Sequence, residues 1–161
     1  MTTGRAAVAL LAALAGCAPP AEPPPPAPGP ERGTVRDVTD GDTIVVDLDG
    51  RPGTRVRLLQ IDAPERGECH ARDATAYLER TVPPGSTVRV EADRDPRDRY
   101  GRDLLYVWSG DGTFVNEAAV REGHARAVLY APNDRHIGRI RAAEADARRE
   151  RRGLWRCPGA L

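Results

Sequence analysis

Acidic and arginine side chains gather at three points of this 161-residue sequence, where short strands are expected to end. The three segments are Asp40-Gly41-Asp42-Thr43, residues 57–65, and Asp98-Arg99-Tyr100-Gly101-Arg102. Taken singly, each has an ordinary structural explanation, because Asp-Gly pairs are typical of hairpin turns and charged residues are typical of exposed loops. Only the combination of the three segments indicates chemistry.

The combination is suited to holding a metal ion beside a phosphate group. Asp42 and Asp62 supply hard oxygen ligands of the kind that Ca²⁺ prefers. Glu65 lies three residues after Asp62, where it could serve as a base. Arg57 and Arg102 supply planar donors whose geometry matches phosphate oxygens.

The elements that must position these residues follow from hydrophobic alternation and from turn residues. Helices are expected at 71–82, 115–122 and 137–151, and strands at 34–38, 43–48, 54–61, 86–91, 103–108 and 125–129. Five or six short strands with three helices favour a small α+β barrel over a parallel sheet. Arg57 and Asp62 are an odd number of residues apart, so they converge only if their strand bulges or ends before Asp62. The break at Ala63-Pro64 favours such an end.

The composition excludes several classes of protein. The 24 cationic residues, all of them arginine, balance 24 acidic residues, which excludes a protein that holds nucleic acid by bulk electrostatics alone. The aromatic content of 4% argues against a binder that works mainly by stacking bases. Three cysteines are too few for a disulfide scaffold or a four-cysteine zinc site. No apolar run approaches the ~20 residues of a transmembrane helix.

The amino-terminal segment indicates export from the cytoplasm. Residues 1–17 combine a positive Arg5 with an apolar stretch, as in a signal peptide. They end in Leu14-Ala15-Gly16-Cys17, which resembles the lipoprotein cleavage motif in which the cysteine, here Cys17, becomes lipidated. An ordinary secretory signal cleaved after Ala13-Leu14-Ala15 is the alternative. Residues 18–32 form a proline-rich linker, expected to be extended, and the folded domain is expected at 33–159.

Six ordered motifs across residues 34–156 resemble the staphylococcal-nuclease-like, or thermonuclease, family. They are Asp40-Gly41-Asp42-Thr43, Arg57-Leu58-Leu59, Ile61-Asp62-Ala63-Pro64-Glu65, Asp98-Arg99-Tyr100-Gly101-Arg102, Val115-Asn116-Glu117-Ala118 and Gly153-Leu154-Trp155. The resemblance implies an α+β fold: an OB-fold five-stranded β-barrel flanked by three α-helices. It also implies a calcium-dependent, sugar-nonspecific endonuclease that leaves 3′-phosphate ends on DNA or RNA.

The resemblance further implies a role for each residue of the site. The ligands of Ca²⁺ would be Asp42, Asp62 and the backbone carbonyl of Ala63, and the catalytic residues would be Arg57, Glu65 and Arg102. The substrate-binding residues would be Asp40, Arg99, Tyr100 and Tyr130. A groove of arginines that includes Arg94, Arg97 and Arg99 would follow the nucleic-acid backbone without reading its sequence.

Two other functions remain open, and both keep the fold. One is a noncatalytic OB-fold module that only binds nucleic acid, which the intact set of catalytic side chains disfavours. The other is an envelope lipoprotein whose domain docks a second protein. In every case we expect a monomer outside the cytoplasm, held to a membrane if Cys17 is lipidated.

The remaining cysteines form a candidate pair. If Cys17 carries lipid, Cys69 and Cys157 are left together in an oxidising compartment. A disulfide between them would fasten the carboxyl-terminal segment near the loop that follows Glu65. Two unpaired thiols are the alternative.

Overall fold

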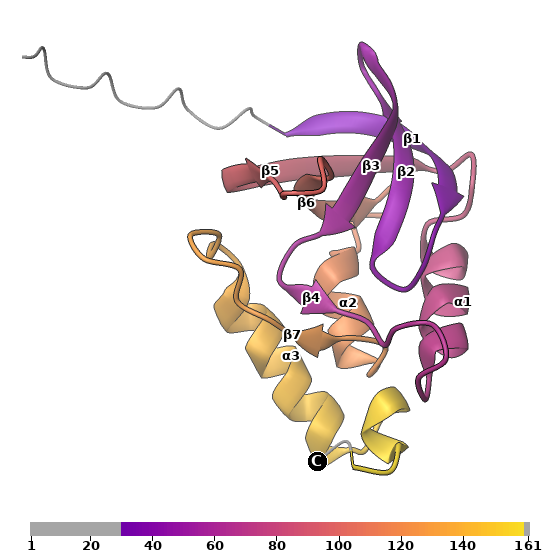
Figure 1. Ribbon diagram of the computed structural model, residues 1–161, viewed down its shortest axis with the longest axis vertical. Coiled ribbons are helices and arrows are strands. Elements are labelled where there is room, and N and C mark those ends of the chain that lie inside the picture. Colours follow the sequence, from indigo (N-terminus) through magenta and orange to yellow (C-terminus); the bar gives the residue numbers. More distant parts are fainter. Residues whose placement is uncertain (1–29, 160–161) are drawn as a thin grey trace, which may run out of the picture.

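Eleven helices and strands make up residues 30–159, the part of the chain that the computed structural model describes (Figure 1). The strands are β1 (Glu31–Val38), β2 (Thr43–Leu48), β3 (Arg51–Leu58), β4 (Ile61–Asp62), β5 (Thr87–Arg97), β6 (Asp103–Ser109) and β7 (Arg126–Ala127). The helices are α1 (Ala71–Thr81), α2 (Val115–Arg121), α3 (Ile137–Arg149) and the 3₁₀ helix η1 (Gly153–Arg156). Cys17 and the predicted signal segment lie outside the described residues. Within residues 30–159, no helix is long and apolar enough to cross a membrane.

Five strands close into a barrel in the order β1-β2-β3-β6-β5. The β3–β6 pair is parallel and the other pairs are antiparallel. The barrel closes where β1 pairs with β5, and β1 begins at Glu31 rather than at Thr34, because Glu31 already pairs with Val90. The predicted α+β, OB-type five-stranded barrel with three α-helices is confirmed.

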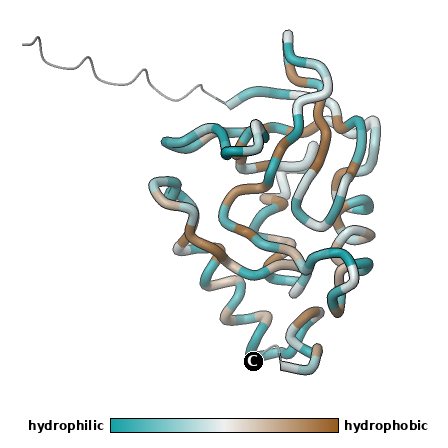
Figure 2. The backbone as a smooth tube through the Cα atoms, viewed as in Figure 1, coloured by the Kyte–Doolittle hydropathy of each residue, from teal (hydrophilic) through white to brown (hydrophobic). Residues whose placement is uncertain are grey.

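The barrel interior is built from aliphatic side chains. Val and Ile favour the pleated, half-buried surface of a strand, and Figure 2 shows hydrophobic stretches along the barrel strands. The side chains that are fully or almost fully buried include Val35, Ile44, Val46, Val56, Leu58, Val88, Val90 and Val107. This packed interior supplies a rigid base for the loops at its ends.

The third strand ends at Leu58, earlier than the pattern predicted. Gln60 has a φ of 63°, in the left-handed region, and it turns the chain into the short strand β4. The side chain of Asn116 on α2 holds this turn: its Nδ2 donates to the Leu59 carbonyl at 2.9 Å, and its Oδ1 accepts from the Val107 amide at 2.9 Å. The strand therefore ends before Asp62, as expected, but the break lies at residues 59–60 rather than at Ala63-Pro64.

The β1–β2 loop lies tightly against the residues that follow β4. A Cβ atom on Gly41 would lie only 2.7 Å from the Cβ of Ala63 and 2.8 Å from the Cβ of Ala74 on α1. Only glycine lets the loop come this close, and the close contact places the neighbouring Asp42 beside the end of β4.

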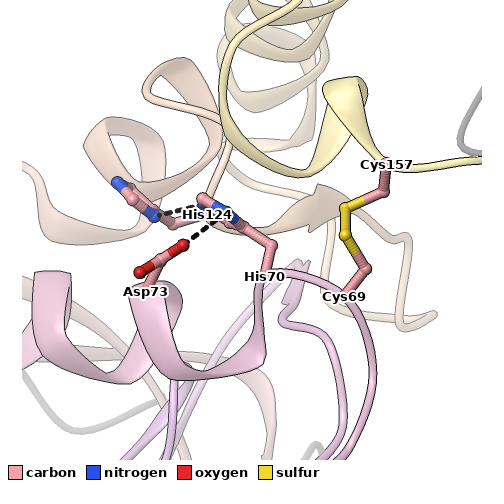
Figure 3. The surroundings of a disulfide bond; sticks show 5 residues. All are labelled: Cys69, His70, Asp73, His124 and Cys157. Carbon is pink, nitrogen blue, oxygen red and sulfur yellow. Dashed lines mark hydrogen bonds and ion pairs between the residues drawn. A yellow bond between two sulfur atoms is a disulfide. The ribbon is translucent and has the colours of Figure 1, made fainter.

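A disulfide joins the loop before α1 to the carboxyl-terminal segment. Cys69 and Cys157 are bonded in the structure, with their Cα atoms 6.1 Å apart (Figure 3). Beside them, the Nε2 of His70 lies 3.0 Å from the Nδ1 of His124, and the Nδ1 of His70 lies 3.1 Å from a carboxylate oxygen of Asp73. The carboxyl-terminal segment is thus attached to the domain by a covalent bond and by packing.

Candidate active site

The residues predicted from the sequence to form a site line one open cleft of about 770 Å³. Nine of the ten predicted positions contribute to its walls: Asp40, Asp42, Arg57, Asp62, Glu65, Arg99, Tyr100, Arg102 and Tyr130. The tenth, Ala63, lies in an adjoining hollow of about 150 Å³ that is also lined by Asp42 and Glu65. We call the larger space the main cleft and the smaller one the linking hollow.

Arg57 is the central side chain of the main cleft, and it is buried. Its Nη1 donates to the carbonyls of Leu58 at 3.0 Å and Ile61 at 2.8 Å. Its Nη2 lies 3.0 Å from the Oδ2 of Asp42 and 2.8 Å from the Oδ1 of Asp62. The early end of β3 makes this contact possible, because Arg57 and Asp62 would otherwise face opposite sides of one strand.

The carboxylate of Asp42 is almost fully buried, at 7% exposure. Its Oδ2 accepts from the Ala63 amide at 2.8 Å, and its Oδ1 accepts from the Thr43 hydroxyl at 3.1 Å. Burial raises the pKa of Asp42 to about 6, although Arg57 and the Ala63 amide favour the charged form. One arginine therefore does not fully compensate the burial of this carboxylate, and a second positive charge would stabilise it.

Asp62 and Glu65 extend the acidic wall towards solvent. The Asp62 side chain is half exposed, and Glu65 is exposed. Within residues 30–159, the Glu65 carboxylate accepts no hydrogen bond, whereas its backbone amide donates to the Oε2 of Glu68 at 2.8 Å. The backbone of the loop is thus fixed while the Glu65 carboxylate stays available to a ligand.

The opposite wall is a short turn between β5 and β6. The carboxylate of Asp98 accepts from the amides of Tyr100 and Arg102 at 2.9 Å, and from the Nε of Arg102 at 2.7 Å. Burial acts to raise the pKa of the Asp98 carboxyl, but these hydrogen bonds and the Arg102 charge hold that pKa below its ordinary value. Within the described part of the chain, neither terminal nitrogen of Arg102 has a hydrogen-bond acceptor.

Aromatic side chains stand at this end of the main cleft. Tyr100 is 64% exposed, and the guanidinium groups of Arg99 and Arg102 lie 4.8 and 5.6 Å from its ring centroid. The hydroxyl of Tyr130 lies 3.4 Å from the Nη2 of Arg57. Both tyrosines line the main cleft.

Two buried amides that sequence reasoning missed hold the loop of Tyr130. The Nδ2 of Asn133 donates to the Asp95 carbonyl and its Oδ1 accepts from the Asp95 amide, at 2.9 and 2.8 Å. The Nε2 of Gln60 donates to the Asn133 carbonyl at 2.9 Å. For Gln60 the available signal was a polar residue inside the apolar run Leu58-Leu59-Gln60-Ile61, and Asn116 in the run Phe114-Val115-Asn116 has the same signature. Asn133, between Pro132 and Asp134, has no such signal.

The predicted groove of arginines is only partly present. Arg97 and Arg99 line the main cleft, although Arg97 also pairs with Asp103 at 3.0 Å. Arg94 instead pairs with Asp134 at 3.0 Å and donates to the Pro132 carbonyl. Arg94 thus anchors the loop before α3 and does not contribute to the wall of the main cleft.

The acidic wall fits a hard divalent cation by the chemistry of its donors. Within residues 30–159, no three His, Cys, Asp or Glu side chains are arranged as a metal site. The predicted set needs only two carboxylates, Asp42 and Asp62, together with a carbonyl. These two carboxylates converge on the same Arg57 nitrogen, and the raised pKa of Asp42 indicates that more positive charge is favourable there.

Comparison with known proteins agrees with this arrangement. The family model described as "Staphylococcal nuclease homologue" matches residues 55–157. The thermonuclease of Staphylococcus intermedius is 39% identical over 127 residues, which cover 75% of this chain and 74% of that protein. The thermonuclease of Staphylococcus hyicus is 37% identical over 124 residues, covering 73% and 72%. An uncharacterized endonuclease of Escherichia coli O157:H7 is 40% identical over 123 residues, covering 76% of each chain.

These relatives span most of the described domain, and the family model includes β4, the β5–β6 turn and the loop of Tyr130. The resemblance predicted from six ordered motifs is therefore confirmed, and the chain belongs to the staphylococcal nuclease family.

Proposed function

We propose that this protein is a calcium-dependent, sugar-nonspecific endonuclease that hydrolyses phosphodiester bonds of DNA and RNA to 3′-phosphate ends. Its family makes the chain a nuclease, that is, a phosphodiester hydrolase. The observation that supports the finer proposal most strongly is the convergence of Asp42, Arg57, Asp62 and Glu65 in one cleft that Arg102 borders.

The acidic wall would hold the metal. Asp42, Asp62 and the carbonyl of Ala63 would bind Ca²⁺, which takes six to eight oxygens and so leaves room for water and a phosphate oxygen. When bound, Ca²⁺ would supply polarisation of the phosphodiester and a position for the attacking water. The buried, incompletely compensated carboxylate of Asp42 supports this assignment.

Glu65 and the two arginines would carry the remaining chemistry. The Glu65 carboxylate would accept the proton of a water whose oxygen forms a bond to phosphorus, while the P–O5′ bond breaks and the departing O5′ takes a proton from solvent. Negative charge then develops on the phosphate oxygens, where the fixed donors of Arg57 and Arg102 lower the barrier. Arg102 supports this role through its two terminal nitrogens, which have no acceptor among the described residues.

The other end of the main cleft would bind the nucleotide. Tyr100 and Tyr130 would contact the base or the sugar, with Arg99 beside Tyr100, and Asp40 would contact the substrate where the main cleft meets the linking hollow. Stacking and phosphate contacts do not depend on base identity or on a 2′-hydroxyl, which supports cleavage of both DNA and RNA.

The protein would act outside the cytoplasm as a monomer, anchored by lipid on Cys17. The disulfide between Cys69 and Cys157 supports an oxidising compartment. Digestion of plasmid DNA and of RNA with Ca²⁺ or with EDTA tests the activity, and labelling of the product ends tests for a 3′-phosphate. Equal activity in EDTA would overturn the calcium requirement. Binding without cutting in Ca²⁺ would support the noncatalytic module instead.

A further inference from the structure

A third hollow lies beyond the predicted site, on the outer face of α1. It has a volume of about 560 Å³, and we call it the α1 groove. Thr39 and Pro64 form one edge, and Arg66, Arg72 and Ala76 form the other walls. Apart from Asp40 at its margin, none of the residues predicted to act in catalysis or binding lines it.

The α1 groove is continuous with the site. The linking hollow shares Asp40, Asp42 and Glu65 with the main cleft, and it shares Thr39, Asp40, Pro64 and Arg66 with the α1 groove. The shared residues place the three hollows in a row, which we call the trench, with the linking hollow, lined by Asp42 and Glu65, between its two arms. Figure 1 shows the two ends, with α1 on one side of β4 and the loop after β7 on the other.

A polymer that is cut at the middle of a trench must occupy both of its arms. The arm at Tyr100 and Tyr130 accommodates the strand on one side of the scissile phosphate. On the other side the linking hollow offers the strand a way out, and the surface that follows it is the α1 groove.

The charges of the α1 groove suit a phosphate backbone. Arg66 and Arg72 are exposed, and neither pairs with a carboxylate within residues 30–159. Arg97 and Arg102, in the main cleft, pair with Asp103 and Asp98. The two arginines of the α1 groove are thus cations without a structural partner, on the path that a strand would take.

The remaining walls explain the hollow shape. Small side chains, Ala71 and Ala76, stand on the helix side, and Gly67 lies in the loop opposite. Asp40 and Glu79 add negative charge at the margins. Sugar and base faces could lie on the apolar floor while the phosphates face the arginines.

We propose that the α1 groove holds the nucleic-acid strand on the side of the scissile phosphate opposite to Tyr100 and Tyr130, with Arg66 and Arg72 contacting backbone phosphates. This inference rests on the proposed nuclease function and adds to it a preference for polymers over dinucleotides.

The test compares the double variant Arg66→Gln/Arg72→Gln with the parent and with Arg80→Gln. Arg80 is a matched control, since it is an exposed arginine of α1 without a carboxylate partner in the described residues and lies outside the three hollows. The substrates carry one natural phosphodiester, flanked on each side by charged phosphorothioate or neutral methylphosphonate linkages. A dinucleotide with a single phosphodiester serves as the minimal substrate.

We expect the double variant to cut the fully charged substrate with a kcat/KM lower by about 3- to 30-fold, the size expected for losing two exposed ionic contacts. Neutralising the linkages on one flank should slow the parent but have little further effect on the double variant. Neutralising the linkages on the other flank should slow the parent and the double variant equally. Arg80→Gln should match the parent, and all three proteins should cut the dinucleotide alike.

The inference is overturned if the double variant cuts the charged substrate as fast as Arg80→Gln, or if it is equally impaired on the dinucleotide. A parent that cuts nothing in Ca²⁺ overturns the proposed nuclease function instead. In that case the affinity for the charged oligonucleotide, measured by fluorescence anisotropy, decides whether the α1 groove binds the strand. Loss of affinity in the double variant alone supports the α1 groove, and equal affinity in all three proteins overturns it.

Discussion

The two walls of the main cleft are held in place by different kinds of contact. The acidic wall, with Asp42, Arg57 and Asp62, depends on residues that are distant in sequence, because Asn116 fixes the turn after β3 and Gly41 allows the approach of the β1–β2 loop. The opposite wall is a turn of five residues, 98–102, that is organised locally, by the carboxylate of Asp98 and by backbone hydrogen bonds within the turn.

The two walls therefore differ in how freely their side chains can move. Arg57 is buried and held by two carbonyls and two carboxylates, so its side chain cannot move unless the barrel around it also changes. Tyr100 is largely exposed on its turn and can adjust to the ligand. The proposed metal ligands and base therefore lie on the wall that the core specifies, whereas Arg102 and the contacts to the nucleotide lie on the wall that local sequence specifies.

The largest effect is expected on the acidic wall, from Glu65→Gln. This change keeps the shape of the side chain but removes the basic carboxylate, so single-turnover cleavage of an oligonucleotide should fall by about 10²–10⁴-fold. Affinity measured without turnover should change much less. A Glu65→Gln protein that cuts as fast as the parent would show that Glu65 is not the base.

On the opposite wall, Arg102→Ala should impair rate and binding together. A guanidinium that contacts the phosphate in both the ground state and the transition state contributes to both quantities. The rate should fall by roughly 10²–10³-fold, the usual loss for one fixed donor. The same single-turnover and affinity measurements check this, and an unchanged affinity would place Arg102 in the transition state alone.

Replacing both Cys69 and Cys157 with serine should lower the free energy of unfolding. The bond closes a loop with a sequence separation of 88 residues, worth up to about 4–5 kcal/mol in the chain-entropy model. Denaturant unfolding of the two proteins measures the difference. Two free thiols titrated in the unfolded, unreduced mature protein would contradict the disulfide.

A direct comparison of the walls comes from Asn116→Ala and Asp98→Asn. Asn116→Ala leaves the Leu59 carbonyl and the Val107 amide buried without partners, at about 1–3 kcal/mol for each group. Asp98→Asn weakens one partly exposed turn and should cost less than about 1 kcal/mol. Equal losses of unfolding free energy in the two variants, measured by denaturant unfolding, would contradict the proposed difference between the two walls.

The smallest effect is the pH dependence from His124, at the junction of α1 and the carboxyl-terminal segment. Burial and, after it, the neighbouring His70 lower the pKa of His124 from the ordinary 6.5 to about 4. The unfolded state therefore takes up the proton first, so this contribution to stability is complete above pH 6.5 and is lost as the pH falls towards 4. His124→Gln should flatten the dependence of the unfolding free energy on pH between pH 6.5 and 4. An unchanged pH dependence in this variant would contradict the assignment to His124.

The sequence predicts the local features of this molecule well and the long-range ones poorly. The barrel, the three helices and the residues of the main cleft follow from strand periodicity and from six motifs, which are local signals. The position of the break after β3, at residues 59–60, could not be predicted, because it depends on Asn116 reaching the Leu59 carbonyl across 57 positions. The role of Arg94 could not be predicted either, because its partner Asp134 lies in another loop.

The disulfide also bears on resistance to proteases, which a protein outside the cytoplasm would encounter. Exposed loop tips are preferred sites of proteolytic nicking, and the turn around Tyr100 is such a tip. A cut there would separate the residues of the acidic wall from Arg102 and Tyr130 along the chain. Because one fragment would carry Cys69 and the other Cys157, the two would stay covalently joined, and the nicked enzyme would keep both walls of its cleft in a single molecule.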